Sequence, residues 1–105
     1  MLIVNTENIP GRRYEVLGLV RGSVVQSKNF GKDFMSAMKT LVGGEIVAYT
    51  ELLQEARQIA MGRMVTQAEE LGADAIVCLR YASSSVMQGA AEVIAYGTAV
   101  RFTDK

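Results

Sequence analysis

The sequence predicts an α+β domain of two layers, in which a mainly antiparallel sheet carries one long and one short helix on one face. Three observations lead to this fold class. Between Tyr49 and Leu71, apolar residues recur every three or four positions, as on one face of a helix. In the flanking segments they alternate with a period of two, as in strands. The strands precede and follow the helices instead of alternating with them, which is typical of α+β domains.

The helix predicted over Tyr49–Leu71 is the longest element. It contains no proline and a single glycine, Gly62. Thr50 is placed to cap its start, because a threonine hydroxyl can accept a hydrogen bond from an unpaired N–H of the first turn. Gly72 can adopt the left-handed conformation that ends a helix. The apolar face, which should lie on the sheet, carries Leu52, Leu53, Ala56, Ile59, Ala60, Met64, Ala68 and Leu71.

Four other segments are predicted strands. They are Met1–Val4, which we expect at a sheet edge, Tyr14–Gln26, Ala73–Ala82 and Glu92–Phe102. The polar stretch Ser83–Gly89 is expected to form a hairpin loop or a short excursion between the last two strands. A second, shorter helix is predicted over Asn29–Val42, where two glycines would end it.

The predicted strands are apolar on both faces. In Tyr14–Gln26 one face carries small and β-branched residues, which suit close approach of the long helix: Val16, Gly18, Val20, Gly22 and Val24. The other face of the sheet would carry Leu17, Leu19, Ile76, Ile94, Tyr96, Val100 and Phe102. Such an apolar face on a monomer would favour aggregation. We therefore expect other copies of the chain to cover this face or the sheet edges, the alternative being cover by the short helix.

The composition excludes several classes of protein. A chain of 105 residues is one domain, residues 1–105. Eleven basic and eleven acidic residues balance, which leaves no charge signature of a nucleic-acid or anionic membrane partner. The apolar runs are too short to span a membrane, and the first residues lack the features of a secretory signal. We expect a cytoplasmic protein.

Short blocks of sequence occur in order along nearly the whole chain: residues 6–11 (TENIPG), 18–22 (GLVRG), 43–45 (GGE), 49–53 (YTELL), 56–57 (AR), 71–75 (LGADA) and 95–99 (AYGTA). Together they resemble the YbjQ-like family of small bacterial proteins, which carries the description "putative heavy-metal-binding". The resemblance implies a dodecin-like subunit and assembly into a ring, a homopentamer. It implies no settled reaction.

A metal site in this chain would have to be built without histidine, since the sequence has none and contains one cysteine. Three routes remain. Cys78 thiolates from several subunits could converge around a symmetry axis. Methionine sulfurs, in the pairs Met35/Met38 and Met61/Met64, could bind a soft ion. Carboxylates could bind a hard ion at a subunit junction, from Glu7, Glu45, Glu51, Asp74 and Glu92. Each route competes with an ordinary structural role, in the core or on the solvated surface.

Three functions remain open. The first is an oligomeric binding protein that holds a metal or small ligand at subunit interfaces, and the second is a structural oligomer without a ligand. The third is an enzyme using Cys78, whose thiolate Arg80 could stabilise, although no catalytic residue is assigned. The candidate ligand-binding residues are charged groups in the family blocks or on the predicted strand faces: Arg21, Glu45, Glu51, Arg57, Arg80 and Glu92. Cys78 is the candidate metal ligand, as an intersubunit ring. Cofactors other than a metal ion are not indicated.

Overall fold

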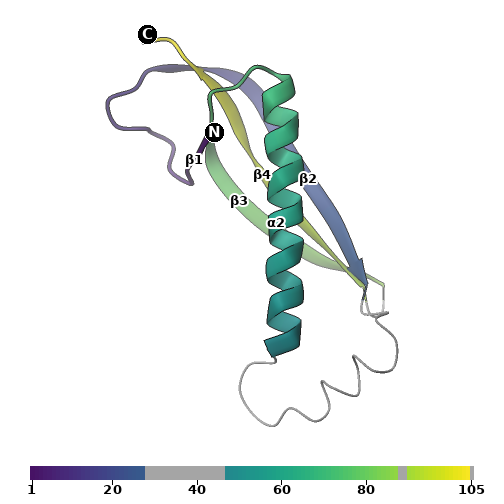
Figure 1. Cartoon of the computed structure of the whole chain (residues 1–105). Helices are drawn as coiled ribbons and strands as arrows, with labels where there is room; N and C mark the ends of the chain where they lie inside the picture. The colour runs from purple at the N-terminus through teal and green to yellow at the C-terminus, as the bar shows by residue number, and fades with distance from the viewer. Residues whose placement is uncertain (28–46, 88–89, 105) are drawn as a thin grey trace.

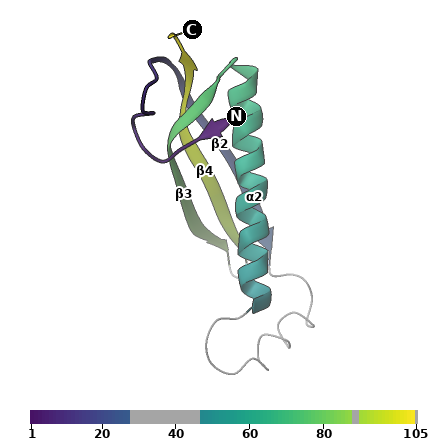
Figure 2. The same ribbon diagram turned by 60° about the vertical axis from the view of Figure 1, so that its left-hand side comes forward.

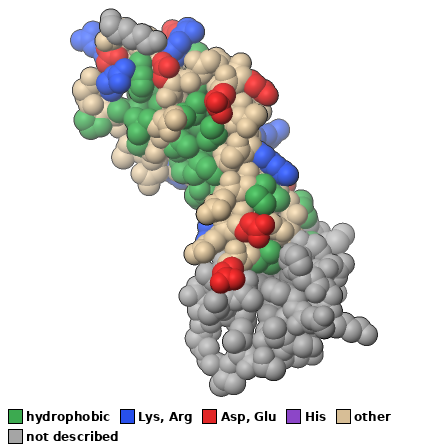
Figure 3. Space-filling view, viewed as in Figure 1, with side chains coloured by type: hydrophobic (Ala, Val, Ile, Leu, Met, Phe, Trp, Pro, Cys, Tyr) green, Lys and Arg blue, Asp and Glu red, His purple; other side chains and the backbone are tan. Residues whose placement is uncertain are grey.

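The computed structural model describes residues 1–27, 47–87 and 90–104. The elements are β1 (Leu2–Ile3), β2 (Tyr14–Ser27), α2 (Val47–Glu70), β3 (Ala75–Met87) and β4 (Ala90–Phe102). The strands form one sheet of order β1-β3-β4-β2, and only β1 pairs in parallel. α2 lies along one face of this sheet (Figures 1 and 2). Figure 3 shows the molecule from the side of Figure 1, with hydrophobic side chains gathered beside the helix. The predicted α+β class and mainly antiparallel sheet are confirmed, whereas the predicted short helix over Asn29–Val42 lies outside the described residues.

α2 packs on the sheet through a stripe of side chains that recurs every four residues. Ala56, Ala60, Met64 and Ala68 are all fully buried, as predicted. Leu71 was predicted to join them but is 46% exposed, because the helix has already ended at Glu70. Among the described residues, no helix is long and apolar enough to cross a membrane.

The sequence predicted the C-terminal end of α2 correctly but not its start. At the C-terminal end Gly72 has a φ of +76°, and its N–H donates to the Glu69 carbonyl while the Ala73 N–H donates to the Ala68 carbonyl. This is the Schellman arrangement that a glycine after the last turn predicts. At the other end the helix begins at Val47, so Thr50 lies inside the first turn and the prediction that it caps the helix was wrong.

Small residues allow α2 to approach the sheet closely. A Cβ atom at Gly22 would lie 2.2 Å from the Ala60 carbonyl oxygen and 2.3 Å from the Met64 nitrogen, so only glycine fits there. Val20 and Val24, on either side in the same face of β2, are buried under the helix. The facing residues of β4 are also small and buried: Val93, Ala95, Gly97 and Ala99. The predicted small-residue face is therefore confirmed in this part of the sheet.

A β-bulge in β2 changes the predicted faces near the start of that strand. The register against β4 passes from Val16–Val100 directly to Gly18–Ala99, so one extra residue lies in β2. As a result Val16 is 64% exposed, and Leu17 packs against the helix-side core. Both residues were predicted the other way round, because strict alternation does not allow for the extra residue.

A second bulge, between Val77 and Arg80 in β3, inverts the faces of that strand. Cys78 at this bulge has a φ of +59°. Ile76 is fully buried on the helix side, so its predicted place on the opposite face was wrong, and Leu79 after the bulge also packs toward the helix. β3 continues to Met87, so most of the loop predicted over Ser83–Gly89 is strand instead.

The face of the sheet away from α2, here called the outer face, is partly covered by the chain itself. Ala75, Val77 and Val100 are buried there beneath the partly buried N-terminal residues Val4 and Ile9. Along the rest of β2 and β4, apolar side chains of the outer face are exposed. These are Leu19 (68% exposed), Val25 (57%) and Tyr96 (37%). The sheet face away from α2 is thus apolar, as predicted, and within one chain part of it is exposed.

Candidate ligand-binding site

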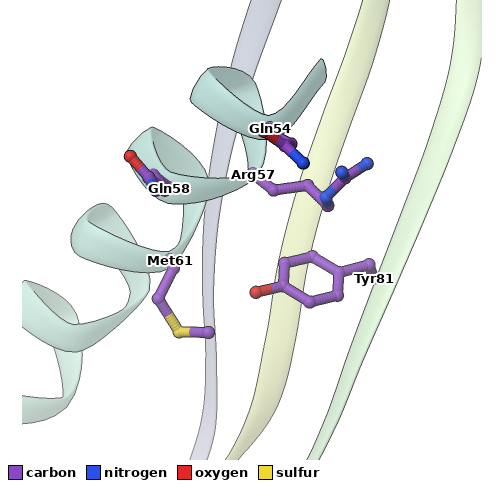
Figure 4. Close-up of a pocket in the computed structure, with 5 residues that line it drawn as sticks. All are labelled: Gln54, Arg57, Gln58, Met61 and Tyr81. Atoms are coloured by element: carbon purple, nitrogen blue, oxygen red, sulfur yellow. The ribbon is translucent and has the colours of Figure 1, made fainter. Parts of the chain in front are cut away.

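A hollow of about 460 Å³ opens between α2 and β3 on the helix side of the sheet (Figure 4). It exists because α2 packs mainly on β2 and β4 and barely contacts β3. Its walls come from Gln54, Arg57, Gln58 and Met61 of α2 and from Tyr81 of β3. The volume falls within the range of roughly 300–1,000 Å³ that is usual for small-molecule sites.

The spacing of the helical residues explains why they meet here. Arg57 and Gln58 lie three and four positions after Gln54, and Met61 lies four and three positions after them, so all four occupy one flank of α2 beside the buried stripe. Tyr81 pairs with Ala95 in the sheet, which places both side chains on the helix side. The side chains of Arg57 and Met61 extend from α2 toward the Tyr81 ring (Figure 4).

Arg57 gives the hollow a positive charge that no described carboxylate neutralises. The residues three and four positions away in the helix are Leu53, Gln54, Ala60 and Met61, so none can form an intrahelical ion pair. The ion pairs found among the described residues are Arg12–Asp104 and Arg101–Glu15, near the ends of β2 and β4. Arg57 is only partly exposed, so its charge is less screened by water than that of a fully exposed arginine.

Two other predicted arginines lie on the outer face. Tyr96 of β4 pairs with Arg21 of β2 on one side and with Arg80 of β3 on the other, so the three residues form a single row across the sheet. Nη1 of Arg80 donates to the Asn5 carbonyl oxygen at 3.1 Å. The structure therefore brings Arg21 and Arg80 into register and separates both from Arg57 by the thickness of the sheet.

The predicted acidic residues that the structure describes join neither group. Glu92 lies on the outer face, four residues along β4 from Tyr96. Glu51 is exposed on α2, and Glu45 lies outside the described residues. Asp74 has a structural role, since its Oδ2 accepts a hydrogen bond from the Phe102 N–H at 2.9 Å.

Comparison with known proteins places the chain in a family. The YbjQ family model, described as "Putative heavy-metal-binding", matches residues 1–103. The chain belongs to the YbjQ family. A relative from Clostridium novyi (strain NT), a UPF0145 protein, is 60% identical over 101 residues, which are 96% of this chain and 98% of the relative. A UPF0145 protein from Thermotoga petrophila is 59% identical over 102 residues, 96% of each chain.

A solved structure supports the fold of this YbjQ chain. It is a protein of unknown function from Pediococcus pentosaceus, assigned to the DUF74 family. Its TM-score is 0.64 at 19% sequence identity, with 98% of each chain covered. At this identity the likeness concerns the fold alone. The dodecin-like description stays a prediction.

The residues of the YbjQ chain that the structure describes do not form a heavy-metal site within one subunit. No three His, Cys, Asp or Glu side chains come together among them. Cys78 packs partly buried beside Ala75, Val77 and Val100 of its own chain. Met64 is fully buried in the core while Met61 lines the hollow, so this methionine pair does not present two sulfurs to one exposed ion.

Most of the hollow was not singled out from the sequence. Arg57 was, because it belongs to a family block, but Gln54, Gln58 and Tyr81 were not selected. The helical spacing that unites Gln54, Arg57, Gln58 and Met61 is visible in the sequence. The missing information is that this flank of α2 overhangs β3, with which the helix makes few contacts.

Proposed function

We propose that this YbjQ protein is a homo-oligomer, a pentamer, that binds a small molecule in the hollow between α2 and β3. The observation that carries the proposal is the hollow itself, which combines a guanidinium group that makes no ion pair with any described residue, an aromatic ring, a thioether and amide groups. Gln54, Arg57 and Gln58 supply polar groups that could orient a ligand, and Met61 and Tyr81 supply apolar contact. No described constellation of residues resembles a catalytic site, so binding is the activity best supported.

An open strand edge next to the hollow supports the assembly. β1 pairs with β3 only at Ala75 and Ile76, and the N-terminal segment continues this pairing no farther than Leu79. Within residues 1–27, 47–87 and 90–104, no strand borders Tyr81–Ser84 on that side. This stretch contains no charge and no proline, which are common protections of an edge. Because Tyr81 also lines the hollow, a second copy docked on this edge would hold the ligand at a subunit interface.

The opposite edge of the sheet differs, since helix side chains cover it. The Gln67 Oε1 accepts a hydrogen bond from the Arg21 backbone N–H at 2.7 Å, and Nη1 of Arg63 donates to the Ser23 carbonyl at 2.6 Å. These contacts satisfy outward-facing backbone groups of β2. They leave the β3 edge as the more available of the two for strand pairing.

The open part of the outer face gives a further reason for assembly. Val16, Leu19 and Val25 are each more than half exposed on β2. Full burial of such a side chain contributes about 1.5–3 kcal/mol. Covering these residues with another copy would therefore stabilise an oligomer by several kcal/mol.

The subunit number is tested by size-exclusion chromatography with light scattering. We expect a mass of about 57 kDa for wild type, five chains of 11.4 kDa. Leu19→Glu should dissociate the assembly, because it would bury a carboxylate in the interface. Leu71→Glu is the matched control, since Leu71 is also exposed but lies at the end of α2. A wild-type monomer, or assembly unaffected by Leu19→Glu, would contradict the outer-face interface.

A further inference from the structure

We infer that the hollow binds a small flat molecule bearing a carboxylate or phosphate group. Arg57 would bind this anionic group, and the ring of Tyr81 would pack against the flat part of the molecule. The inference rests on the proposed function, because it assumes that the hollow binds a small molecule. It adds the chemical class of that molecule.

The anionic group follows from the charge of the hollow. Arg57 is the one charged residue among the five that line it. It makes no ion pair with any described residue, and its helical neighbours at three and four positions are uncharged. A guanidinium group presents parallel N–H donors that match a carboxylate or a phosphate. An anionic ligand would form the ion pair with Arg57 that no described residue of the chain forms.

The flat ring follows from the residues around Arg57. Tyr81 is 43% exposed, and its ring is directed from β3 toward α2. Met61 extends from the helix toward the same ring. Aromatic rings and thioether groups both make favourable contacts with the face or edge of another aromatic ring. A planar ligand can therefore lie against Tyr81 and Met61 with its anionic group at Arg57.

The same residues argue against a metal cation as the occupant of the hollow. The lining contains no carboxylate, thiol or imidazole, which are the usual ligands of divalent metals. The thioether of Met61 is the one soft donor there, and the guanidinium of Arg57 would repel a cation beside it. Any metal bound by the protein would have to be held elsewhere.

Three naphthalene probes test the ligand class on the full-length protein. They are 2-naphthoate, 2-naphthyl phosphate and the neutral 2-naphthamide, and their binding is read from their own fluorescence because the chain has no tryptophan. We expect at least one anionic probe to bind at least tenfold more tightly than the amide. Whichever anion binds better identifies the anionic group.

Variants locate the binding. Arg57→Gln should weaken the anionic probes at least tenfold and leave the amide unchanged, because it removes the charge and keeps a polar side chain. Tyr81→Leu should weaken all three probes. Arg13→Gln is the matched control, since it removes an exposed arginine just before β2, at the end of the sheet away from the hollow, and should change none of the affinities. Circular dichroism melts of each variant establish that it is folded.

The outcomes separate the inference from the proposed function. If the amide binds as tightly as both anions and Arg57→Gln has no effect, the ligand class is wrong but small-molecule binding stands. If no probe binds, the inference is also wrong. The proposed function is then judged independently, by whether the purified oligomer carries another bound molecule.

Discussion

Replacing Gly22 by alanine should separate α2 from the sheet. The new Cβ would lie 2.2 Å from the Ala60 carbonyl oxygen, 2.3 Å from the Met64 nitrogen and 2.7 Å from the Arg63 Cβ. The first separation is about 1 Å shorter than an ordinary carbon–oxygen contact. Two of the three atoms belong to the helix backbone, so no side-chain rotation can relieve the overlap and the helix itself has to move.

The energetic cost can be estimated from that movement. A retreat of about 0.5–1 Å removes roughly a quarter to a half of the dispersion energy of each contact it opens, and Gly22 faces Ala60 and Met64, which are both fully buried. Overpacking of a core usually costs about 1–3 kcal/mol and sometimes more. We expect Gly22→Ala to lower the free energy of unfolding by about 3 kcal/mol.

Gly62→Ala provides the matched control for this prediction. Gly62 lies in the same helix, but a Cβ there meets nothing within 4 Å. Alanine in a helix interior is favoured over glycine by roughly 0.5–1 kcal/mol, so this variant should be slightly more stable than wild type. Urea unfolding at one fixed protein concentration measures both. Equal stability of the two variants would refute the close packing of α2 on β2.

Three further perturbations test local features. In urea unfolding, Cys78→Gly should stay within about 1 kcal/mol of wild-type stability, because glycine tolerates the positive φ at this position. Cys78→Val should lose roughly 2 kcal/mol in the same assay, because valine does not. Equal stabilities of the two variants would contradict the bulge. Gly97→Ala should cost about 1–3 kcal/mol in the same assay, since its Cβ would lie 2.8 Å from Ile76 Cγ2; an unchanged midpoint would contradict that contact. The side-chain hydrogen bond from Arg12 lowers the pKa of Asp104 below 3.8, so this pair stabilises the fold above that pH and its contribution is lost as the pH falls through the lowered pKa. Asp104→Asn should therefore be less stable than wild type at neutral pH and equal to it in strong acid, and a deficit that persists in acid would contradict the ion pair.

Periodicity predicted the elements of this fold well, because burial repeats regularly along them. The stripe from Ala56 to Ala68 repeats every four residues without interruption, and the helix lies where that repeat does. β4 alternates without a bulge from Ala90 to Phe102, and Tyr96 lies on the outer face, as predicted. The position of Gly72 at the end of α2 likewise follows from the local conformation that glycine permits.

Periodicity failed at the bulges, because one extra residue inverts every face that precedes or follows it. Val16 and Ile76 were therefore assigned to the wrong sides of the sheet, because the local sequence does not indicate either bulge. The candidate site shows the same limit at a larger scale. Arg57 and Tyr81 are 24 positions apart, and they meet only because α2 crosses β2 and β4 and overhangs β3.

Native mass spectrometry of untagged protein, purified without chelators, tests the proposed function most directly, because one spectrum reports both the subunit number and any retained mass. We expect a pentamer that carries a small organic molecule. A pentamer carrying metal ions in a fixed ratio to subunits would instead favour the Cys78 ring, and an empty pentamer would favour a structural role. A monomer would contradict the account, because the open β3 edge and the apolar outer face would then remain uncovered.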